Sequence, residues 1–194
     1  MDRTVKSILI GSILGDGHIE PSTRNGSRWV VKYDDKYLPY LDWLHRSTRS
    51  LRLNEIKAKK NYHQHYFATK PLKELAYYRE HFYPEGKKII PEDMGSLLKD
   101  NLSLAVWYMD DGNLDFRNKY HFNASIATFC FSYKECVHLA LVLKDNFDIE
   151  ARVHKSTMRG KLQYRLYIAA GSMERFIDLI RPYIQSVFLY KIGL

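Results

Sequence analysis

Two apolar runs stand out in the pattern of hydrophobic and polar positions, and each ends in an acid followed by a glycine. Residues 8–14 lead into Gly15-Asp16-Gly17, and residues 103–109 lead into Asp110-Asp111-Gly112. Both runs have the length and composition of a buried helix. The carboxyl end of a helix already carries partial negative charge and favours Lys, Arg or His. An acid at that place in both runs therefore indicates a purpose other than helix stability.

The rest of the pattern predicts the same order of elements twice. After the first run we expect a hairpin over 18–33, a helix over 35–53, strands over 55–60 and 63–70, and a helix over 71–82. After the second run we expect a hairpin over 114–130, a helix from a capping box at Ser132 and Glu135 through Phe147, strands over 150–157 and 162–169, and a helix capped by Ser172 that reaches 181–183. Asp16 and Asp111 are 95 residues apart, and Pro84 and Pro182 are 98 apart. The sequence thus predicts a tandem duplication of an αββαββα unit, with halves at 1–98 and 99–194.

This order predicts a mixed α+β fold with a pseudo-two-fold axis. Each half is expected to form one antiparallel, saddle-shaped sheet, with one face packed on helices and the other presented to a ligand. The two acid-ending helices are expected to pack side by side at the centre. Gly11 and Gly15, and Ala105 in the second copy, allow their backbones to approach closely.

Composition adds the class of partner. The 194 residues include 30 Lys and Arg against 22 Asp and Glu, a formal charge of +8, and 15 tyrosines. This excess favours a polyanion, and a two-fold body suits duplex DNA. On charge alone, a basic soluble protein without such a partner remains the alternative.

Other chemistries have little support in the sequence. Cys130 and Cys136 are too few for a zinc finger and are expected to be reduced, and the run 8–14 is too short for a secretory or membrane segment. We therefore expect a soluble intracellular protein. His63 and His65 share a strand face, but a DNA-facing or solvent-exposed pair is more usual than a metal site without a third ligand.

Polar residues alternate with apolar ones along the predicted strands, and they supply donors for phosphates and base edges. A half-buried strand has a polar solvent side in any case, but the pattern recurs in both halves. The predicted DNA-binding residues are Arg24, Arg28, Lys32, Lys57, Lys59, Arg117, Lys119, Asn123, Ser125, Arg152, Lys155, Gln163 and Arg165.

If the two helices are neighbours, Asp16 and Asp111 emerge together in the basic surface. Paired carboxylates repel each other unless a cation neutralises them. Hard oxygen ligands favour Mg²⁺, which polarises a phosphodiester and activates water. The pair therefore predicts metal-dependent phosphodiester hydrolysis.

These residues resemble the LAGLIDADG homing endonucleases, in the single-chain branch whose second motif reads like Trp107-Tyr108-Met109-Asp110-Asp111-Gly112. The resemblance covers essentially the whole chain. In this family the acid before the terminal glycine binds metal, which implies that role for Asp16 and Asp111. Gly15 and Asp110, which precede these acids, are assigned a secondary part in the metal site.

The resemblance also implies a basic residue near the scissile phosphate in each half. The segment 87–91 points to Lys88, and Tyr190-Lys191 points to Lys191. The alternative for each is an ordinary solvated lysine. Family members often carry Gln or Asn on a strand of each half, whereas apolar residues stand near Val30 and Phe129 here; Lys32 or Thr128 are the candidate substitutes.

The resemblance implies a monomeric, site-specific double-strand DNA endonuclease with a long asymmetric target, encoded in an intron or similar mobile element. It further implies two or more Mg²⁺ ions, Mn²⁺ as a substitute, Ca²⁺ binding without cleavage, and short 3′ overhangs. The alternative is an intron-splicing maturase, with intron RNA as partner, or a non-cleaving nucleic-acid-binding regulator of the same fold.

Overall fold

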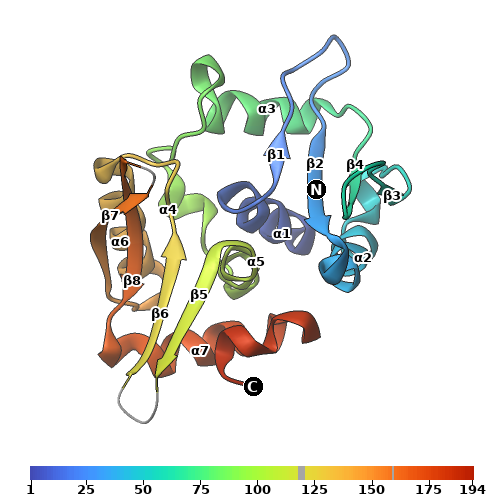
Figure 1. Cartoon of the computed structure of the whole chain (residues 1–194). Coiled ribbons are helices and arrows are strands. Elements are labelled where there is room, and N and C mark those ends of the chain that lie inside the picture. The colour runs from blue at the N-terminus through green and yellow to red at the C-terminus, as the bar shows by residue number, and fades with distance from the viewer. Residues whose placement is uncertain (118–120, 159) are drawn as a thin grey trace.

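A computed structural model describes residues 1–117, 121–158 and 160–194. Two four-stranded antiparallel sheets flank a central pair of helices, α1 (Arg3–Leu14) and α5 (Asn101–Asp111), which lie side by side between them (Figure 1). The mixed α+β class and the two antiparallel sheets predicted from the sequence are confirmed.

The first sheet has the strand order β1-β2-β4-β3. Its elements and the helices that follow or precede them are β1 (His18–Ile19), β2 (Trp29–Asp34), η1 (Asp35–Tyr37), α2 (Leu38–Ser47), η2 (Arg49–Leu51), β3 (Lys57–Ala58), β4 (Gln64–Ala68), α3 (Lys73–Phe82), η3 (Pro84–Gly86) and α4 (Met94–Leu97). Pro39 falls in the first turn of α2, where a missing N–H costs nothing.

The second sheet has the matching order β5-β6-β8-β7. Its elements are β5 (Gly112–Arg117), β6 (His121–Ala127), α6 (Tyr133–Phe147), β7 (Ala151–Met158), β8 (Lys161–Ile168), η5 (Ala170–Ser172), α7 (Met173–Ile180), η6 (Arg181–Tyr183) and η7 (Ser186–Ile192). The predicted capping box of Ser132 and Glu135 is present at the start of α6.

Several local predictions need correction. The first helix ends at Leu14, so Gly15 and Asp16 lie beyond it. Ser172 does not cap α7 with its side chain, because its hydroxyl accepts a hydrogen bond from the Glu150 N–H. The short helices α4 and η7 were not predicted, since neither spans enough residues for a clear period.

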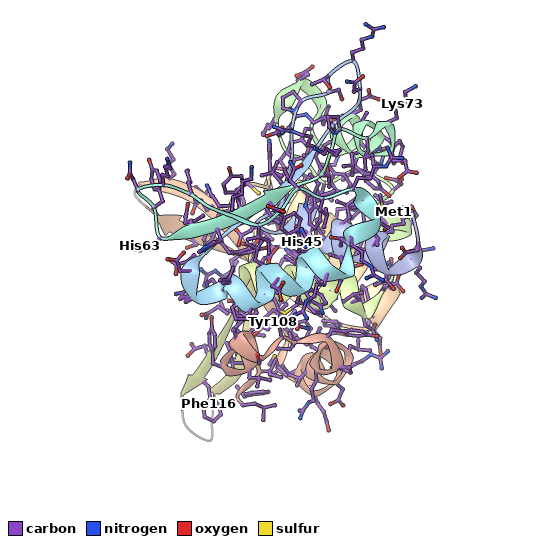
Figure 2. The ribbon with its side chains drawn as sticks, turned by 90° about the vertical axis from the view of Figure 1, so that its right-hand side faces the viewer. Met1, His45, His63, Lys73, Tyr108 and Phe116 are labelled. Carbon is purple, nitrogen blue, oxygen red and sulfur yellow. The ribbon has the colours of Figure 1, made fainter. Side chains whose placement is uncertain are left out.

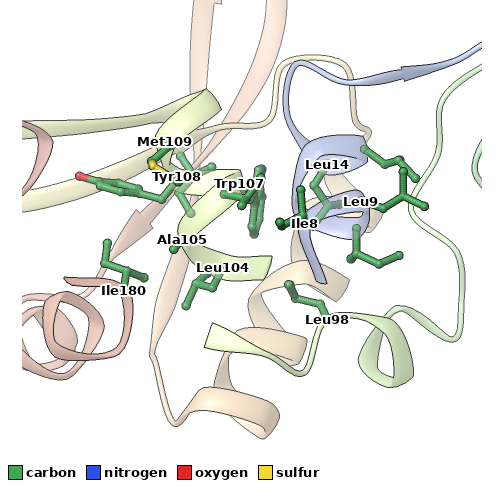
Figure 3. Close-up of a cluster of buried hydrophobic side chains, with 14 of the residues drawn as sticks. Ile8, Leu9, Leu14, Leu98, Leu104, Ala105, Trp107, Tyr108, Met109 and Ile180 are labelled. Atoms are coloured by element: carbon green, nitrogen blue, oxygen red, sulfur yellow. The ribbon is translucent and has the colours of Figure 1, made fainter. Parts of the chain in front are cut away.

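Close packing of α1 on α5 depends on glycine. A Cβ on Gly11 would lie 2.4 Å from the carbonyl oxygen of Ser103 and 2.7 Å from Cβ of Val106. Gly11 therefore faces the Ser103 backbone and the Val106 side chain directly. The helix pair sits inside one continuous core with Trp107 and Tyr108 fully buried (Figure 3). The core that holds the two sheets together is thus the same core that holds the two acid-bearing helix ends together.

Strand register relates the two sheets residue by residue. His18 pairs with Val30 in the first sheet, and Asn113 pairs with Ser125 in the second. Since His18 and Asn113 each lie two residues after an acid, Val30 and Ser125 occupy equivalent places.

The halves at 1–98 and 99–194 remain a prediction. Among the described residues, none of the helices combines the length and apolarity needed to cross a membrane.

Candidate active site

Each acid is followed by a glycine because the chain turns tightly against its own helix there. A Cβ on Gly17 would lie 2.1 Å from Oγ of Ser12, and a Cβ on Gly112 would lie 2.1 Å from the ring of Tyr108. Both glycines also donate their N–H back to the helix, to Ser12 and to Tyr108 respectively. The Asp-Gly pair in each motif therefore has a steric cause that is independent of its chemistry.

Two lysines donate hydrogen bonds to the carbonyl ends of α1 and α5, where the acids add negative charge to a helix end that is already negative. Nζ of Lys88 donates to the carbonyl oxygens of Gly15 at 2.9 Å and Leu14 at 3.4 Å. Nζ of Lys191 donates to the carbonyl oxygens of Met109 at 2.5 Å and Asp110 at 3.4 Å. These are equivalent positions in the two motifs. An ammonium group at the end of a helix satisfies free carbonyls and offsets the negative end of the dipole.

The same lysines bring positive charge to the acids. Burial, followed by the neighbouring Asp16 charge, raises the pKa of Asp111 to about 7, and Lys88 and Lys191 oppose that rise. Partial desolvation also raises the pKa of Asp16, against the charges of Lys191, Lys88 and Lys32. Burial lowers the pKa of both Lys88 and Lys191. Asp16, Asp111, Lys88 and Lys191, which were predicted from far-apart segments, therefore form one electrostatic cluster.

Asp110 is engaged differently from the other two acids. Its Oδ1 accepts hydrogen bonds from the hydroxyls of Tyr33 at 2.8 Å and Tyr40 at 3.1 Å, and its Oδ2 accepts one from the N–H of Asp16 at 3.1 Å. Burial, then the charge of Asp16, raises the pKa of Asp110 well above its usual value. The carbonyl oxygen of Gly15 is likewise taken by Lys88. These contacts occupy oxygens of Gly15 and Asp110, and the secondary part that both residues were assigned in the metal site stays a prediction.

The donor set fits a hard divalent cation that keeps much of its own hydration. Asp16 and Asp111 supply two carboxylates whose pKa values are raised first by burial and, for Asp111, next by the charge of Asp16. Within the described ranges, no three His, Cys, Asp or Glu side chains form a metal cage. Mg²⁺ is commonly held by one or two carboxylates, with waters and substrate phosphates completing its shell. A metal at this place would therefore depend on the phosphate as well as on the protein.

A cleft opens from Asp16 over the solvent face of the first sheet, with a volume of about 640 Å³. Lys32, Tyr66 and Lys57 are direct neighbours across β2, β4 and β3, so they share this face. Lys59 and Lys32 line the cleft. Arg24 is exposed in the β1–β2 loop, while Arg28 is paired with Glu20 at 2.6 Å. The first half therefore presents a row of lysines beside the acid.

The second sheet presents different groups at the equivalent places. Ala127, Arg165 and His154 form the row that matches Lys32, Tyr66 and Lys57. Arg165 lies over the ring of Phe129 at 5.1 Å. Its Nε and the Oε1 of Gln163 have no hydrogen-bond partner among the residues that the structure describes. Arg152 and Lys155 are exposed, Asn123 is half-buried and Ser125 is buried. Lys119 lies outside the described residues, and of Arg117 only the backbone is described.

The proposed substitutes for the family's strand amides do not behave alike. The strand register matches Val30 to Ser125, not to Phe129. Thr128 is buried and its hydroxyl donates to the carbonyl oxygen of Tyr164, which leaves it unsuited as a substitute. Lys32 remains a candidate because its charge acts on Asp16. The sequence analysis did not find Tyr33 and Tyr40, because no local sequence pattern indicates that their hydroxyls donate to Asp110, 77 and 70 residues away.

The structure also locates the histidine pair and the two cysteines, for which the sequence offered little support as metal or redox sites. Nδ1 of His65 lies 2.9 Å from Asp35 and Nδ1 of His63 lies 3.6 Å from it. Figure 2 shows His63 at the outer end of the first sheet. Cys136 is buried and Cys130 exposed, and neither is in a disulfide.

Comparison with known proteins gives one family. The model of the LAGLIDADG DNA endonuclease family matches residues 6–176. The cytochrome b mRNA maturase bI2 of Debaryomyces hansenii is 28% identical over all of this chain and 75% of its own length. A RecA protein of Mycolicibacterium flavescens is 30% identical over 95% of this chain, which spans only 45% of that relative. The DNA endonuclease I-ChuI of Chlamydomonas applanata is 24% identical, with 97% and 94% of the two chains covered.

Solved structures show the same fold. The homing endonuclease I-WcaI bound to its DNA recognition sequence has a TM-score of 0.79 at 24% identity, covering 98% of this chain and 86% of that one. I-DmoI in complex with DNA and Mn has a TM-score of 0.55 at 15% identity, covering 91% and 96%. The neighbours thus share the arrangement of two sheets around a central helix pair.

Proposed function

The chain belongs to the LAGLIDADG DNA endonuclease family, and from that premise we propose that it is a site-specific endonuclease that cuts both strands of duplex DNA with Mg²⁺. The observation that carries the proposal is the paired arrangement of one acid and one lysine at each of two adjacent helix ends. Two equivalent sets, one per half, are what two antiparallel phosphodiester strands require. The relative I-ChuI and the neighbour I-WcaI, named as endonucleases, support it.

In this proposal Asp16 and Asp111 hold the cation, which supplies Lewis-acid polarisation of the phosphate and a lowered pKa for an attacking water. Mn²⁺ is expected to substitute, and Ca²⁺ to bind without supporting cleavage. Lys88 and Lys191 place ammonium groups where negative charge develops on the phosphate. Their hydrogen bonds to the helix ends hold them there before the substrate arrives.

The two sheets would follow the DNA on either side of the cut. At register-equivalent places the first sheet carries Lys32, Tyr66 and Lys57, and the second carries Ala127, Arg165 and His154. We therefore propose a long asymmetric target, cleaved by one copy of the chain to leave short 3′ overhangs. Because Lys and Arg on these faces would neutralise phosphates, affinity should fall steeply with salt.

Digestion of a randomised duplex library with Mg²⁺, followed by sequencing of the ends, tests this function. We expect recurrent ends at one sequence, with paired breaks on the two strands. The library treated with Asp16→Asn should give no such ends, and Asp145→Asn, an exposed acid on α6, should match the wild type.

A second candidate is intron splicing without cleavage, favoured by the likeness to maturase bI2 over all of this chain. Absence of recurrent ends at any sequence, together with tight binding of an intron RNA, would establish that function instead.

A further inference from the structure

The acid that precedes the metal ligand in the second motif is tied to the opposite half of the molecule. Asp110 lies on α5, whereas its three hydrogen-bond donors all belong to the first half: Tyr33 on β2, Tyr40 on α2 and the backbone of Asp16. In the first motif the same place is held by Gly15, whose missing side chain leaves the room that Asp110 fills. A Cβ on Gly15 would lie 2.5 Å from Cβ of Asp110.

The two tyrosines are themselves fixed by packing. Tyr33 and Tyr40 are buried, with their rings in edge contact at 5.1 Å. Tyr40 also meets Phe188 edge-on at 4.9 Å, and Phe188 lies on η7, the segment that carries Lys191. A displacement of Asp110 or Tyr40 would therefore shift both the backbone of Asp16 and the segment that carries Lys191.

We propose that Asp110, Tyr33 and Tyr40, here called the Asp110 network, position Asp16 for metal binding and are not metal ligands. The hydroxyls of Tyr33 and Tyr40, which belong to a packed aromatic cluster, fix the carboxylate of Asp110. That carboxylate in turn fixes the main chain of Asp16 by accepting its N–H. The network acts in one direction only, because Gly15 offers Asp111 no corresponding group. Outer groups that orient a metal ligand commonly contribute about 10-fold to 100-fold in metal affinity.

This inference rests on the proposed function, in which Asp16 binds the cation. It differs from direct ligation by Asp110 in one testable respect. If Asp110 were a ligand, removal of the tyrosine hydroxyls would leave its oxygens free and metal affinity unreduced. If Asp110 is a positioning residue, removal of those hydroxyls weakens the metal site although every carboxylate is still present.

The experiment measures Mn²⁺ affinity of the full chain by calorimetry, for the wild type, Asp16→Asn, Tyr33→Phe/Tyr40→Phe and Tyr78→Phe. Tyr78→Phe is the matched control, since Tyr78 is buried in α3 and its hydroxyl has no hydrogen-bond partner among the described residues. We expect the double variant to weaken Mn²⁺ binding about tenfold or more, and the control to match the wild type. A thermal melt of each variant verifies that it is folded.

The outcomes separate the two hypotheses. Wild-type Mn²⁺ binding that Asp16→Asn abolishes and the double variant leaves unchanged would overturn the positioning role while the metal site stands. Wild-type Mn²⁺ binding that does not depend on Asp16 would overturn the metal site and the network with it. Should the double variant fail to fold, Tyr33→Phe and Tyr40→Phe are measured singly: each removes one hydroxyl donor to Asp110 and keeps every carboxylate, so each should weaken Mn²⁺ binding, and wild-type affinity in both would contradict positioning.

Discussion

The two acid-bearing helix ends are equivalent in sequence position but are built differently. In the first half, α1 stops at Leu14 and Asp16 lies beyond it on non-helical backbone. In the second half, α5 remains helical through Asp111 and turns only at Gly112. Asp16 is exposed and held from outside by the side chain of Asp110, whereas Asp111 is half-buried and held by its own helix. The duplication thus preserves the place of the acid and not the means of holding it.

Substitution of either acid tests whether the two ends do equal work. Asp16→Asn and Asp111→Asn should each lower double-strand cleavage by at least about 10³-fold, because loss of a metal-binding charge removes several kcal/mol of transition-state stabilisation. Cleavage of each strand is measured separately on labelled duplex, with binding measured in Ca²⁺. Loss of DNA binding in parallel with cleavage would contradict the metal assignment.

The lysines differ in burial, and that difference predicts different secondary effects. Lys88→Met and Lys191→Met should each slow cleavage about 10²-fold to 10³-fold through loss of a charge aimed at the phosphate. Lys191 is only 7% exposed, so its loss also leaves buried carbonyls unsatisfied at about 1–3 kcal/mol. Chemical denaturation should show this loss for Lys191→Met and a smaller one for half-buried Lys88→Met. Equal stability losses would argue that the two helix ends are capped alike.

The close approach that makes the comparison possible depends on Gly11. Gly11→Ala places a methyl group 2.4 Å from the Ser103 carbonyl oxygen, so it should destabilise the fold by about 1–3 kcal/mol through overpacking. The control is Gly171→Ala, where a new Cβ meets no described atom within 4 Å. A Gly11→Ala melt that matches the control would mean that α1 and α5 pack less closely than the structure shows.

Burial of Asp111, which raises its pKa to about 7, makes the stability of the fold depend on pH, in the same direction as the raised pKa values of Asp16 and Asp110. The folded state keeps the Asp111 proton up to about pH 7, while the unfolded chain releases it near pH 3.8. Between these values rising pH therefore destabilises the fold, by up to about 1.4 kcal/mol per pH unit for one proton. Melts in EDTA should show this slope, and Asp111→Asn should reduce it whereas Asp145→Asn should not. A slope that Asp111→Asn leaves intact would assign the effect to other groups.

Much of the fold was predictable because its signals are local. Alternation and capping residues placed the strand pairs and the start of α6, and the repeat of Asp-Gly placed the two acids at one centre. The contacts that complete the site are not local: Lys88 and Lys191 bond to carbonyls 73 and 82 residues away, and Tyr40 bonds to an acid 70 residues away. The resemblance supplied the lysines, but only the fold reveals that they cap the helices, and only the fold reveals Tyr33 and Tyr40.

The smallest expected effect is on base preference, and it distinguishes the two sheets by one substitution in each. Lys32 in the first sheet and Arg165 in the second lie in equivalent cross-strand rows. They are on different strands of those rows, because Lys32 on β2 corresponds to Ala127 on β6, and Arg165 on β8 corresponds to Tyr66 on β4. The two half-sites should therefore be read by groups at different distances from the helix pair. Lys32→Ala should relax base preference in one half-site and Arg165→Ala in the other, each by about tenfold or less. Sequencing of cleaved libraries measures both at once, and relaxation of the same half-site by both variants would contradict the assignment of one sheet to each side of the cut.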